Sequence, residues 1–245
     1  MVLRGKFPYE RKGPNRDALH LMWNISHPAD VLPEEYQHYD RVFVASEQHA
    51  EVMEQHLPGR VHSLLQCTDP EQFYPRQDGT GEDSRRDIIF VGNTRSERRD
   101  LVMAAAKASH SVRIYGRGWR NFELGDRVVA DYIENEQLGS LYRSARICLN
   151  DHWPDMIKHG FINNRIFDAL ACGLPLLSDQ HPSVEKLFGS RGLLQTDAGT
   201  AGQALGHILM RYPAYLEAAH EASEWVREEH SFDARASALA ERAIG

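Results

Sequence analysis

Six short apolar runs recur between residues 87 and 196, and a loop or a segment with apolar residues at helical spacing follows each of them. The runs occupy residues 87–92, 111–116, 127–132, 145–150, 174–179 and 191–196. Strands that alternate with helices indicate a parallel sheet, because parallel neighbours need a crossover connection between them. Right-handed crossovers place helices on both faces of the sheet. The pattern therefore predicts an α/β domain built on a doubly wound parallel sheet.

A shorter alternation of the same kind precedes residue 87. Residues 18–26, 41–46 and 61–66 have the composition of buried strands, and residues 47–57 carry apolar positions at helical spacing between the last two. This order indicates parallel strands joined by a helix. The stretch TDPEQFYPRQDGTGEDSRRD follows, rich in proline, glycine and charge, which is typical of a connection between domains.

These observations predict the domain organisation of the chain. We expect a partial N-terminal α/β segment over residues 1–78 and a boundary near residues 75–86. The second domain is expected over residues 79–230, and a C-terminal closing helix over residues 231–245. A length of 245 residues lies between one domain and two small ones, so it is compatible with this division.

Composition and charge exclude several function classes. The chain has 28 Lys and Arg against 35 Asp and Glu, and its formal charge of −7 argues against non-specific nucleic-acid binding. Three cysteines lie far apart without CxxC spacing, so neither a zinc site nor a disulfide framework is indicated, and a reducing cytoplasm suits them. The start MVLRGKFPYERKG lacks the apolar centre of a signal peptide, and a run of about eighteen apolar residues occurs nowhere. We expect a cytoplasmic protein with no membrane span and no nucleic-acid partner.

The carboxyl ends of the predicted strands carry the candidate ligand-binding residues, because ligands bind there in doubly wound sheets. Gly92 and Gly116 follow the first two strands of the second domain, where the lack of a Cβ lets the backbone approach a ligand. The sequence GNTRSER after the first strand lacks the G-x-G-x-x-G fingerprint, which argues against a dehydrogenase. The basic residues Arg95, Arg98 and Arg99 could bind phosphate or face solvent, and the sequence leaves both interpretations open.

The stretch HGFINNRIFDALACGLPLLSD, residues 159–179, places polar residues just before a short predicted helix. If the helix begins near Asn164, its free N–H groups and dipole point toward the carboxyl edge of the sheet, and Arg165 adds a full positive charge. This combination suits a diphosphate. Asp168 lies one turn further on, where a carboxylate can accept hydrogen bonds from a ribose diol. In the alternative interpretation, Asn163 caps the helix and Asp168 is solvated.

The same stretch resembles the donor-binding signature of GT-B-fold glycosyltransferases of the group 1 (family 4) type, in which an acidic residue, Gly-Phe and EAMACGxPVI follow in order. Other stretches extend the resemblance over most of residues 20–240. YDRVFVASEQHAEVM resembles ADxVIAVSE, LLQCTDPEQFYP resembles the interdomain IPNGVDxxxFxP, and IIFVGNTRSERRDLVMAAAKA resembles ILFVGRLxxxKGxDxLIxA. LMWNISHPADV, LLQCTDP and NRIFDALACG are closest to the CgeB-like branch, associated with spore maturation and bacterial surface polysaccharides.

The resemblance implies two Rossmann-like domains and transfer of a sugar from a nucleotide diphosphate donor held by the C-terminal one. Asp168 matches the glutamate that binds the donor ribose, and Gly92 and Arg95 match the glycine and basic group at the diphosphate. Arg165 extends the phosphate site, and His27 falls where a histidine often faces the donor sugar. The expected catalytic residues are therefore His27, Arg95 and Arg165. The expected donor nucleotide-binding residues are Gly92, Asn93, Tyr115, Gly116, Tyr132, Ile133, Asn150, His159, Gly160, Phe161, Asn163, Asn164 and Asp168.

Within this set, Tyr132 and Ile133 follow the third strand, where the fold typically receives the nucleobase. His27 precedes Pro28 and could instead be an ordinary turn histidine. The segment NDHWPDMIKH contains Asp and His residues that could bind a metal ion, but their spacings match no common metal-binding pattern. Sugar donors of GT-B enzymes also generally need no bound metal. We expect a UDP- or GDP-sugar as substrate, with no metal and no cofactor.

The chain departs from the family pattern in two respects. Gly160 stands eight residues before Asp168, where the pattern has its first glutamate, and His159 is one step further away. The first domain of the family is represented only by its last strands, as a truncated Rossmann-like part. We therefore expect either an N-terminal domain that lies upstream or on a partner chain, or a shortened natural protein.

Two function classes follow from the sequence. The first is a hexosyltransferase that acts on a surface or spore-coat glycan and retains the anomeric configuration, with cations and helix dipoles stabilising the departing diphosphate. The second is a non-catalytic nucleotide-sugar-binding or scaffold module derived from such an enzyme. The breadth of the resemblance favours the first class, whereas the truncated first domain and the absent first glutamate favour the second.

Overall fold

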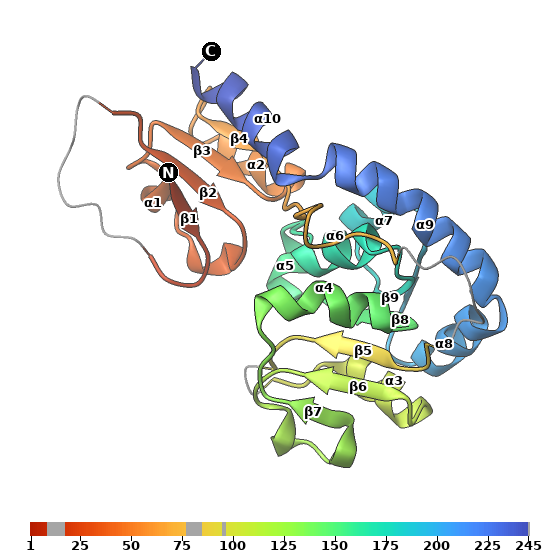
Figure 1. Ribbon diagram of the computed structural model, residues 1–245. Coiled ribbons are helices and arrows are strands. Elements are labelled where there is room, and N and C mark those ends of the chain that lie inside the picture. Colours follow the sequence, from red (N-terminus) through yellow and green to blue (C-terminus); the bar gives the residue numbers. More distant parts are fainter. Residues whose placement is uncertain (9–17, 77–84, 95–96, 245) are drawn as a thin grey trace. The chain divides into compact units, whose positions relative to one another are not determined.

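The computed structural model describes residues 1–8, 18–76, 85–94 and 97–244 (Figure 1). The chain forms two compact units, and each has its own parallel sheet. Unit 1 comprises Met1–Cys67, His152–Asn164 and His230–Gly245, and unit 2 comprises Thr68–Asp151 and Arg165–Glu229. The two parallel sheets confirm the predicted α/β fold class.

Unit 2 is built on a six-stranded sheet in which every pairing is parallel. Its strands are β5 (Ile88–Val91), β6 (Val112–Tyr115), β7 (Val128–Ala130), β8 (Ile147–Asn150), β9 (Leu176–Asp179) and β10 (Leu193–Thr196). They lie in the order β10-β9-β8-β5-β6-β7. This order confirms the six predicted strands and their doubly wound arrangement.

Helices cover both faces of this sheet (Figure 1). They are α3 (Asp100–Ala108), α4 (Asn135–Ser144), α6 (Asn164–Ala171), α7 (Pro182–Phe188), α8 (Ala201–Met210) and α9 (Tyr212–Glu229), with the 3₁₀ turns η2 (Trp119–Asn121) and η3 (Gly125–Arg127). α3 and α8 pack on one face, where Val102 and Ile208 share a core with Leu149 of β8. α4, α6 and α7 belong to crossovers that run the opposite way along the sheet, so right-handed connections place them on the other face. No helix in these described ranges is both long and apolar enough to cross a membrane.

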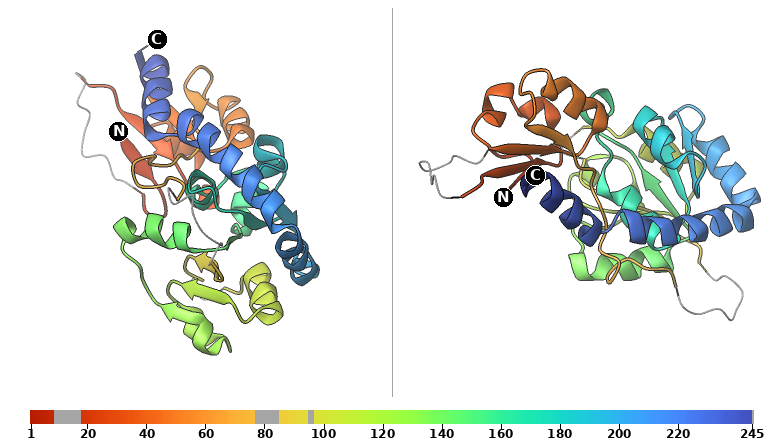
Figure 2. Two further views of the ribbon diagram at one scale, coloured as in Figure 1. Left: turned by 45° about the vertical axis from the view of Figure 1, so that its right-hand side comes forward. Right: turned by 90° about the horizontal axis from the view of Figure 1, so that it is seen from above.

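Unit 1 has a four-stranded parallel sheet in the order β1-β2-β3-β4. Its elements are β1 (Val2–Arg4), β2 (Leu21–Asn24), the 3₁₀ turn η1 (Pro28–Asp30), α1 (Pro33–Tyr36), β3 (Arg41–Val44), α2 (Glu47–Glu54), β4 (Val61–Ser63), α5 (Pro154–Lys158) and α10 (Phe232–Ile244). α10 packs on one face of the sheet, where Leu239 meets a core that contains Phe43 (Figure 2). α1 and α2 pack on the other face, where Tyr36 and Met53 share a core with Val42.

β1 is a strand that the sequence did not predict, because three residues are too few for a periodic signal. A charged side chain, that of Arg4, closes it and is almost completely buried. Arg4 forms an ion pair with Glu35 on α1, and its Nη2 donates to the carbonyl oxygen of Asp30 at 2.9 Å. Charge-assisted hydrogen bonds therefore hold β1 to the helix that covers it.

Two segments from far along the chain complete unit 1. α5 and the residues after it bring Met156 and Phe161 into the core that contains Tyr36. Arg235 on α10 donates hydrogen bonds to the carbonyl oxygens of Leu65 and Gln66, at 2.8 and 3.2 Å.

The domain limits predicted from sequence stay a prediction, and the boundary expected near residues 75–86 falls largely on residues 77–84, outside the described residues.

A pair of histidines, the buried His49 and the half-buried His159, lies in unit 1. The Nδ1 atoms of His49 on α2 and His159 after α5 are 3.2 Å apart, and the Tyr36 hydroxyl lies 3.5 Å from His49 Nε2. The hydroxyl of Ser46 accepts a hydrogen bond from the backbone N–H of His49 and donates one to the carbonyl oxygen of His159. Burial lowers the pKa of His49 to about 4, and the charge of His159 lowers it further in the same direction. His49 is therefore neutral at pH 7.

We predict that the free energy of unfolding decreases as the pH falls from about 6.5 to about 4. The unfolded chain protonates its histidines near the upper value, whereas folded His49 resists protonation down to the lower one. The contribution of neutral His49 to the free energy of unfolding is fully present above the pKa of the unfolded chain. It is lost in this pH window, because the unfolded state binds more protons there. Urea denaturation at several pH values measures the slope.

His49→Gln should reduce this pH dependence, and the exposed His38→Gln should leave it unchanged. A residual slope is expected in His49→Gln, because burial and the charge of Arg235 lower the pKa of His230 to about 4 as well. An identical slope in the wild type and in His49→Gln would contradict a buried, neutral His49.

Candidate functional site

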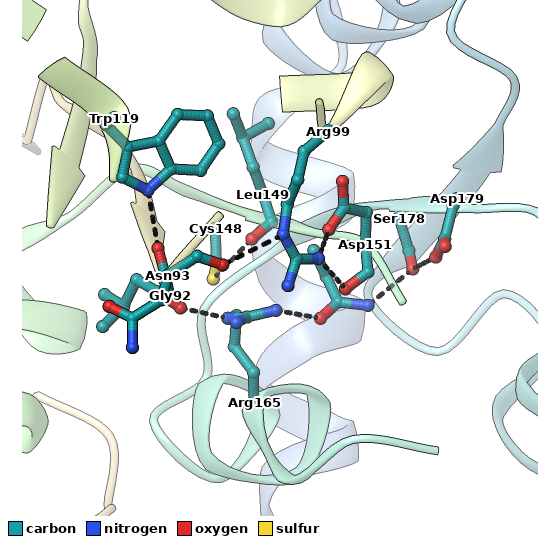
Figure 3. Close-up of polar contacts among 12 residues, drawn as sticks. Gly92, Asn93, Arg99, Trp119, Cys148, Leu149, Asp151, Arg165, Ser178 and Asp179 are labelled. Atoms are coloured by element: carbon teal, nitrogen blue, oxygen red, sulfur yellow. Dashed lines mark hydrogen bonds and ion pairs between the residues drawn. The ribbon is translucent and has the colours of Figure 1, made fainter. Parts of the chain in front are cut away.

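β5 and β8 are neighbours at the centre of the sheet in unit 2, and the chain leaves their carboxyl ends toward opposite faces. β5 leads to α3 on one face, and the connection after β8 leads to α6 on the other. This is the topological switch point of the sheet, where ligands bind in doubly wound folds. Figure 3 shows the polar contacts of this region.

Arg165 spans the ends of the two central strands. From α6, its Nε donates to the carbonyl oxygen of Val91 at 2.7 Å, and its Nη1 donates to Oδ1 of Asn150 at 2.8 Å (Figure 3). The guanidinium carbon lies 4.5 Å from the centroid of the Phe90 ring. The side chain is half-buried, and a guanidinium has five N–H donors. Arg165 therefore presents a fixed cation at the switch point, with more donors than these two bonds use.

A second guanidinium joins the loops that follow the same strands. Arg99, the residue before α3, forms an ion pair with the carboxylate of Asp151 and donates to the carbonyl oxygens of Asp151 and Asn93, at 3.2 and 3.3 Å (Figure 3). Arg99 and Asp151 are both buried. Burial raises the pKa of the Asp151 carboxyl, and the charges of Arg99 and Arg165 oppose that rise. Because buried charges require partners, Asp151 holds Arg99 at the switch point.

Asn150 fixes the orientation of Arg165. Its side chain is fully buried, and Nδ2 donates to the hydroxyl of Ser178 at 2.9 Å. That hydroxyl donates to Oδ1 of Asp179 at 3.0 Å, while Oδ1 of Asn150 accepts the bond from Arg165. The amide thus links the ends of β8 and β9 to the cation. Direct contact between Asn150 and a nucleotide stays a prediction.

Gly92 and Gly116 approach each other at the carboxyl ends of β5 and β6. A Cβ on Gly116, which has a φ of +145°, would lie 2.3 Å from the carbonyl oxygen of Gly92. A Cβ on Gly92 would instead lie 2.6 Å from Nη2 of Arg165. The indole of the fully buried Trp119 donates to the carbonyl oxygen of Gly92 at 2.7 Å. Position 116 therefore has to be glycine because the backbone of Gly92 occupies the space of a Cβ. Glycine at position 92 leaves room for the Arg165 guanidinium.

The loops after β5, β6 and β7 carry the other predicted residues of unit 2. Asn93 is exposed, and its Oδ1 accepts a hydrogen bond from the backbone N–H of Arg117 at 2.7 Å. Tyr132 is also exposed, with its ring centroid 6.0 Å from the guanidinium carbon of Arg117. Tyr115 and Ile133 are half-buried. An exposed aromatic ring beside a cation can stack on a flat aromatic ligand.

Asp168 is buried, with 5% of its surface exposed, so the alternative of a solvated helix residue is wrong. Its Oδ1 accepts a hydrogen bond of 2.8 Å from the hydroxyl of Thr68, which is fully buried. α6 begins at Asn164, as predicted, and this places Arg165 and Asp168 one turn apart.

The remaining predicted residues lie outside unit 2 or outside the described residues. His159, Gly160, Phe161, Asn163 and Asn164 belong to unit 1, where the Phe161 ring is fully buried in the core. Their roles toward a donor stay predictions. His27 also belongs to unit 1, and its φ of +54° makes it the one non-glycine residue of the described ranges with a positive φ. Arg95 lies outside the described residues.

Sequence reasoning left the roles of two neighbouring arginines open. Arg98 is exposed and pairs with Asp100 at 2.7 Å, whereas Arg99 turns inward. The sequence signal that could have distinguished the buried arginine from the exposed one is Asp151, whose carboxylate comes directly after a buried strand. Trp119 and Thr68 had no such signal, because their bonds join loops that are far apart in sequence.

No group of three or more His, Cys, Asp or Glu side chains within the described parts of the chain is arranged to hold a metal ion. In the segment NDHWPDMIKH, the Asp151 carboxylate pairs with Arg99.

Residues 95–241, more than half of the chain, match the model of a protein family described as glycosyl transferase-like. No curated protein sequence matches the chain.

Solved structures share the fold at low sequence identity. Sucrose-phosphate synthase from Thermosynechococcus elongatus is 18% identical with a TM-score of 0.65, over 90% of this chain and 66% of that one. HepE from Anabaena, solved in complex with UDP, is 11% identical with a TM-score of 0.66, over 90% of this chain and 71% of that one. WaaG, a glycosyltransferase involved in lipopolysaccharide biosynthesis, is 14% identical with a TM-score of 0.65, over 93% of this chain and 76% of that one. These similarities confirm the GT-B fold, and the chain spans about 66% of the length of the synthase.

We predict that Gly116→Ala lowers the free energy of unfolding by about 1–3 kcal/mol, because its Cβ meets backbone and the positive φ strains an L residue. Gly92→Ala should cost less, since Gly92 has no positive φ and the atoms that its Cβ meets belong to side chains rather than to backbone. Urea denaturation compares the two variants. Gly206 in α8 has open space around it, so Gly206→Ala should stabilise the protein by about 0.5–1 kcal/mol. Equal stability of Gly116→Ala and the wild type would contradict the close approach to Gly92.

Proposed function

The chain belongs to the glycosyl transferase-like family, and from this premise and the geometry of the switch point we propose that it transfers a sugar from a nucleoside diphosphate sugar to an acceptor. The observation that carries the proposal is the placement of Arg165 and Arg99, each of which bridges the ends of β5 and β8 or the loops after them. A guanidinium offers paired N–H donors that match the oxygens of a phosphate. The first turn of α6 adds the positive end of its helix dipole.

In the proposed reaction, the bond between the anomeric carbon of the sugar and the diphosphate oxygen breaks. The bonding electrons go to that oxygen, an acceptor hydroxyl forms the new bond to the anomeric carbon, and its proton is released. Negative charge therefore develops on the diphosphate. Arg165, already oriented by Val91 and Asn150, stabilises this charge without further rearrangement.

The other parts of the donor have candidate positions in unit 2. Asp168 lies one turn beyond Arg165 and is proposed to accept hydrogen bonds from the ribose hydroxyls. The exposed Tyr132 and the half-buried Ile133 are proposed to contact the nucleobase. Gly92 and Asn93, at the start of the loop after β5, are proposed to approach the diphosphate through their backbone.

Three features support finer proposals about the reaction. HepE binds UDP and UDP-glucose in its solved structures, which supports a UDP-sugar, with glucose or another hexose, as donor. The resemblance to the CgeB-like branch supports a surface or spore-coat glycan as acceptor, and the resemblance to the group 1 type supports retention of the anomeric configuration. The strained backbone of His27 supports its proposed role at the reacting sugar, because such strain clusters at functional sites. Arg95 is proposed as a further cation.

The cytoplasm is proposed as the location, because the three cysteines lack the spacing of a disulfide framework. No metal is assigned a part in the proposed reaction, since Arg165 and Arg99 supply the positive charge.

The binding of UDP, GDP, ADP and TDP, measured by isothermal titration, tests the donor site. We predict that Arg165→Gln weakens binding by about tenfold to a hundredfold, because it removes charge-assisted hydrogen bonds to the diphosphate. Arg98→Gln is the matched control. It removes the same charge, but from an exposed side chain that pairs with Asp100. Affinity unchanged in Arg165→Gln, or equally weakened in both variants, would contradict a diphosphate site at Arg165.

Transfer itself is tested with radiolabelled UDP-glucose and glycan acceptors, or by hydrolysis of the donor in their absence. Release of UDP that depends on Arg165 supports the transferase. Tight, Arg165-dependent binding without transfer or hydrolysis would instead support a non-catalytic nucleotide-sugar-binding module, which the glycine at position 160 favours.

A further inference from the structure

A hydrogen bond between two buried side chains links the start of unit 2 to α6. Thr68 is the first residue of unit 2, and Asp168 lies one hundred residues later in the chain. The Thr68 hydroxyl donates to Oδ1 of Asp168 at 2.8 Å, and the two residues have 0% and 5% of their surface exposed. A buried carboxylate requires hydrogen-bond donors, and the Thr68 hydroxyl supplies one of them.

The surroundings of Asp168 increase the importance of that donor. Burial raises the pKa of Cys172 to about 12, and among the charges that act on this thiol, Asp168 raises the pKa further while Arg143 opposes it. Burial also raises the pKa of Cys148 to about 12, with Arg165 opposing the rise and Asp168 adding to it. The carboxylate therefore shares its surroundings with two buried thiols and with the cations Arg143 and Arg165. A hydroxyl in this environment orients a carboxylate more strongly than it would in water.

The Thr68 hydroxyl is not needed to hold the turn that follows it. In that turn, the backbone N–H of Glu71 donates to Oδ1 of Asp69 at 2.9 Å, and the N–H of Phe73 donates to the carbonyl oxygen of Asp69 at 2.8 Å. Phe73 is buried against Tyr142, with ring centroids 5.9 Å apart. The backbone of this segment is thus fixed by its own contacts, and the hydroxyl is available to act on Asp168.

We propose that Thr68 is a positioning residue for the nucleotide ribose, which holds the Asp168 carboxylate in the orientation in which it accepts hydrogen bonds from the ribose hydroxyls. This inference rests on the proposed function. A carboxylate has two oxygens and about four acceptor sites, so the bond from Thr68 to one oxygen sets the plane of the group without exhausting its capacity. Aspartate has one fewer rotatable bond than the glutamate of the family pattern, so a hydrogen bond to one of its oxygens restricts the carboxylate more closely.

The test compares each nucleoside diphosphate with its 2′,3′-dideoxy analogue. Isothermal titration first identifies which of UDP, GDP and ADP the wild type binds most tightly, and then measures the affinity ratio between that nucleotide and its dideoxy form. We expect a ratio of about ten in the wild type, which corresponds to about 1.4 kcal/mol. Thr68→Val, which keeps the shape and removes the hydroxyl, should lower the ratio toward one, and Thr68→Ser should restore it.

A loss of folding would not produce this pattern, because it weakens both ligands together. Thr68→Ala serves as the second hydroxyl-free variant if Thr68→Val does not fold. Asp168→Asn, which keeps the shape of the side chain, is the reference for complete loss of the ribose preference.

Four results would overturn the inference, and the last of them would overturn the proposed function as well. If Thr68→Val keeps the wild-type ratio while Asp168→Asn loses it, Asp168 binds ribose without help from Thr68. If Thr68→Val weakens both ligands equally, Thr68 acts on the fold alone. If the ratio is one in the wild type, the ribose is held elsewhere, although the proposed function stands. Absence of binding by every nucleoside diphosphate would overturn the proposed function together with the inference.

Discussion

Two guanidinium groups join the loops at the centre of the sheet in unit 2. Arg165 reaches the ends of β5 and β8 from α6, and Arg99 reaches the loops after the same strands from the start of α3. Both lie over the Phe90 ring, with the guanidinium carbons 4.5 and 5.5 Å from its centroid. Because both positive charges lie against the same ring, the buried Asp151, which pairs with Arg99, offsets one of them. The region retains positive charge where parallel sheets of this kind bind ligands.

The residues around the two cations make their positions rigid. Asn150 bonds Arg165 on one side and Ser178 on the other, and Trp119 holds the carbonyl group of Gly92 beside the guanidinium. A polar site arranged before the ligand arrives stabilises developing charge more effectively than one that must reorganise. The family to which the chain belongs and this arrangement of cations are the basis of the transfer reaction proposed above.

Local sequence patterns predicted much of this architecture, whereas contacts between residues far apart in the sequence could not be predicted from it. Strand and helix periods are local, so the six strands of unit 2 and the start of α6 could be predicted. The inward turn of Arg99 depends on a partner 52 residues away, and the burial of Asp168 depends on Thr68, a hundred residues away. β1 is similar, because its last residue is a buried arginine that pairs with Glu35. Each of these features becomes apparent only when distant segments pack together.

The proposed transfer requires a diphosphate at the switch point beside Arg165. A crystal structure of the protein with its best-binding nucleoside diphosphate would show where that group binds. We predict diphosphate oxygens about 2.7–2.9 Å from the guanidinium nitrogens of Arg165, between the loop after β5 and the first turn of α6. A diphosphate bound elsewhere, with Arg165 bonded only to Val91 and Asn150, would contradict the account.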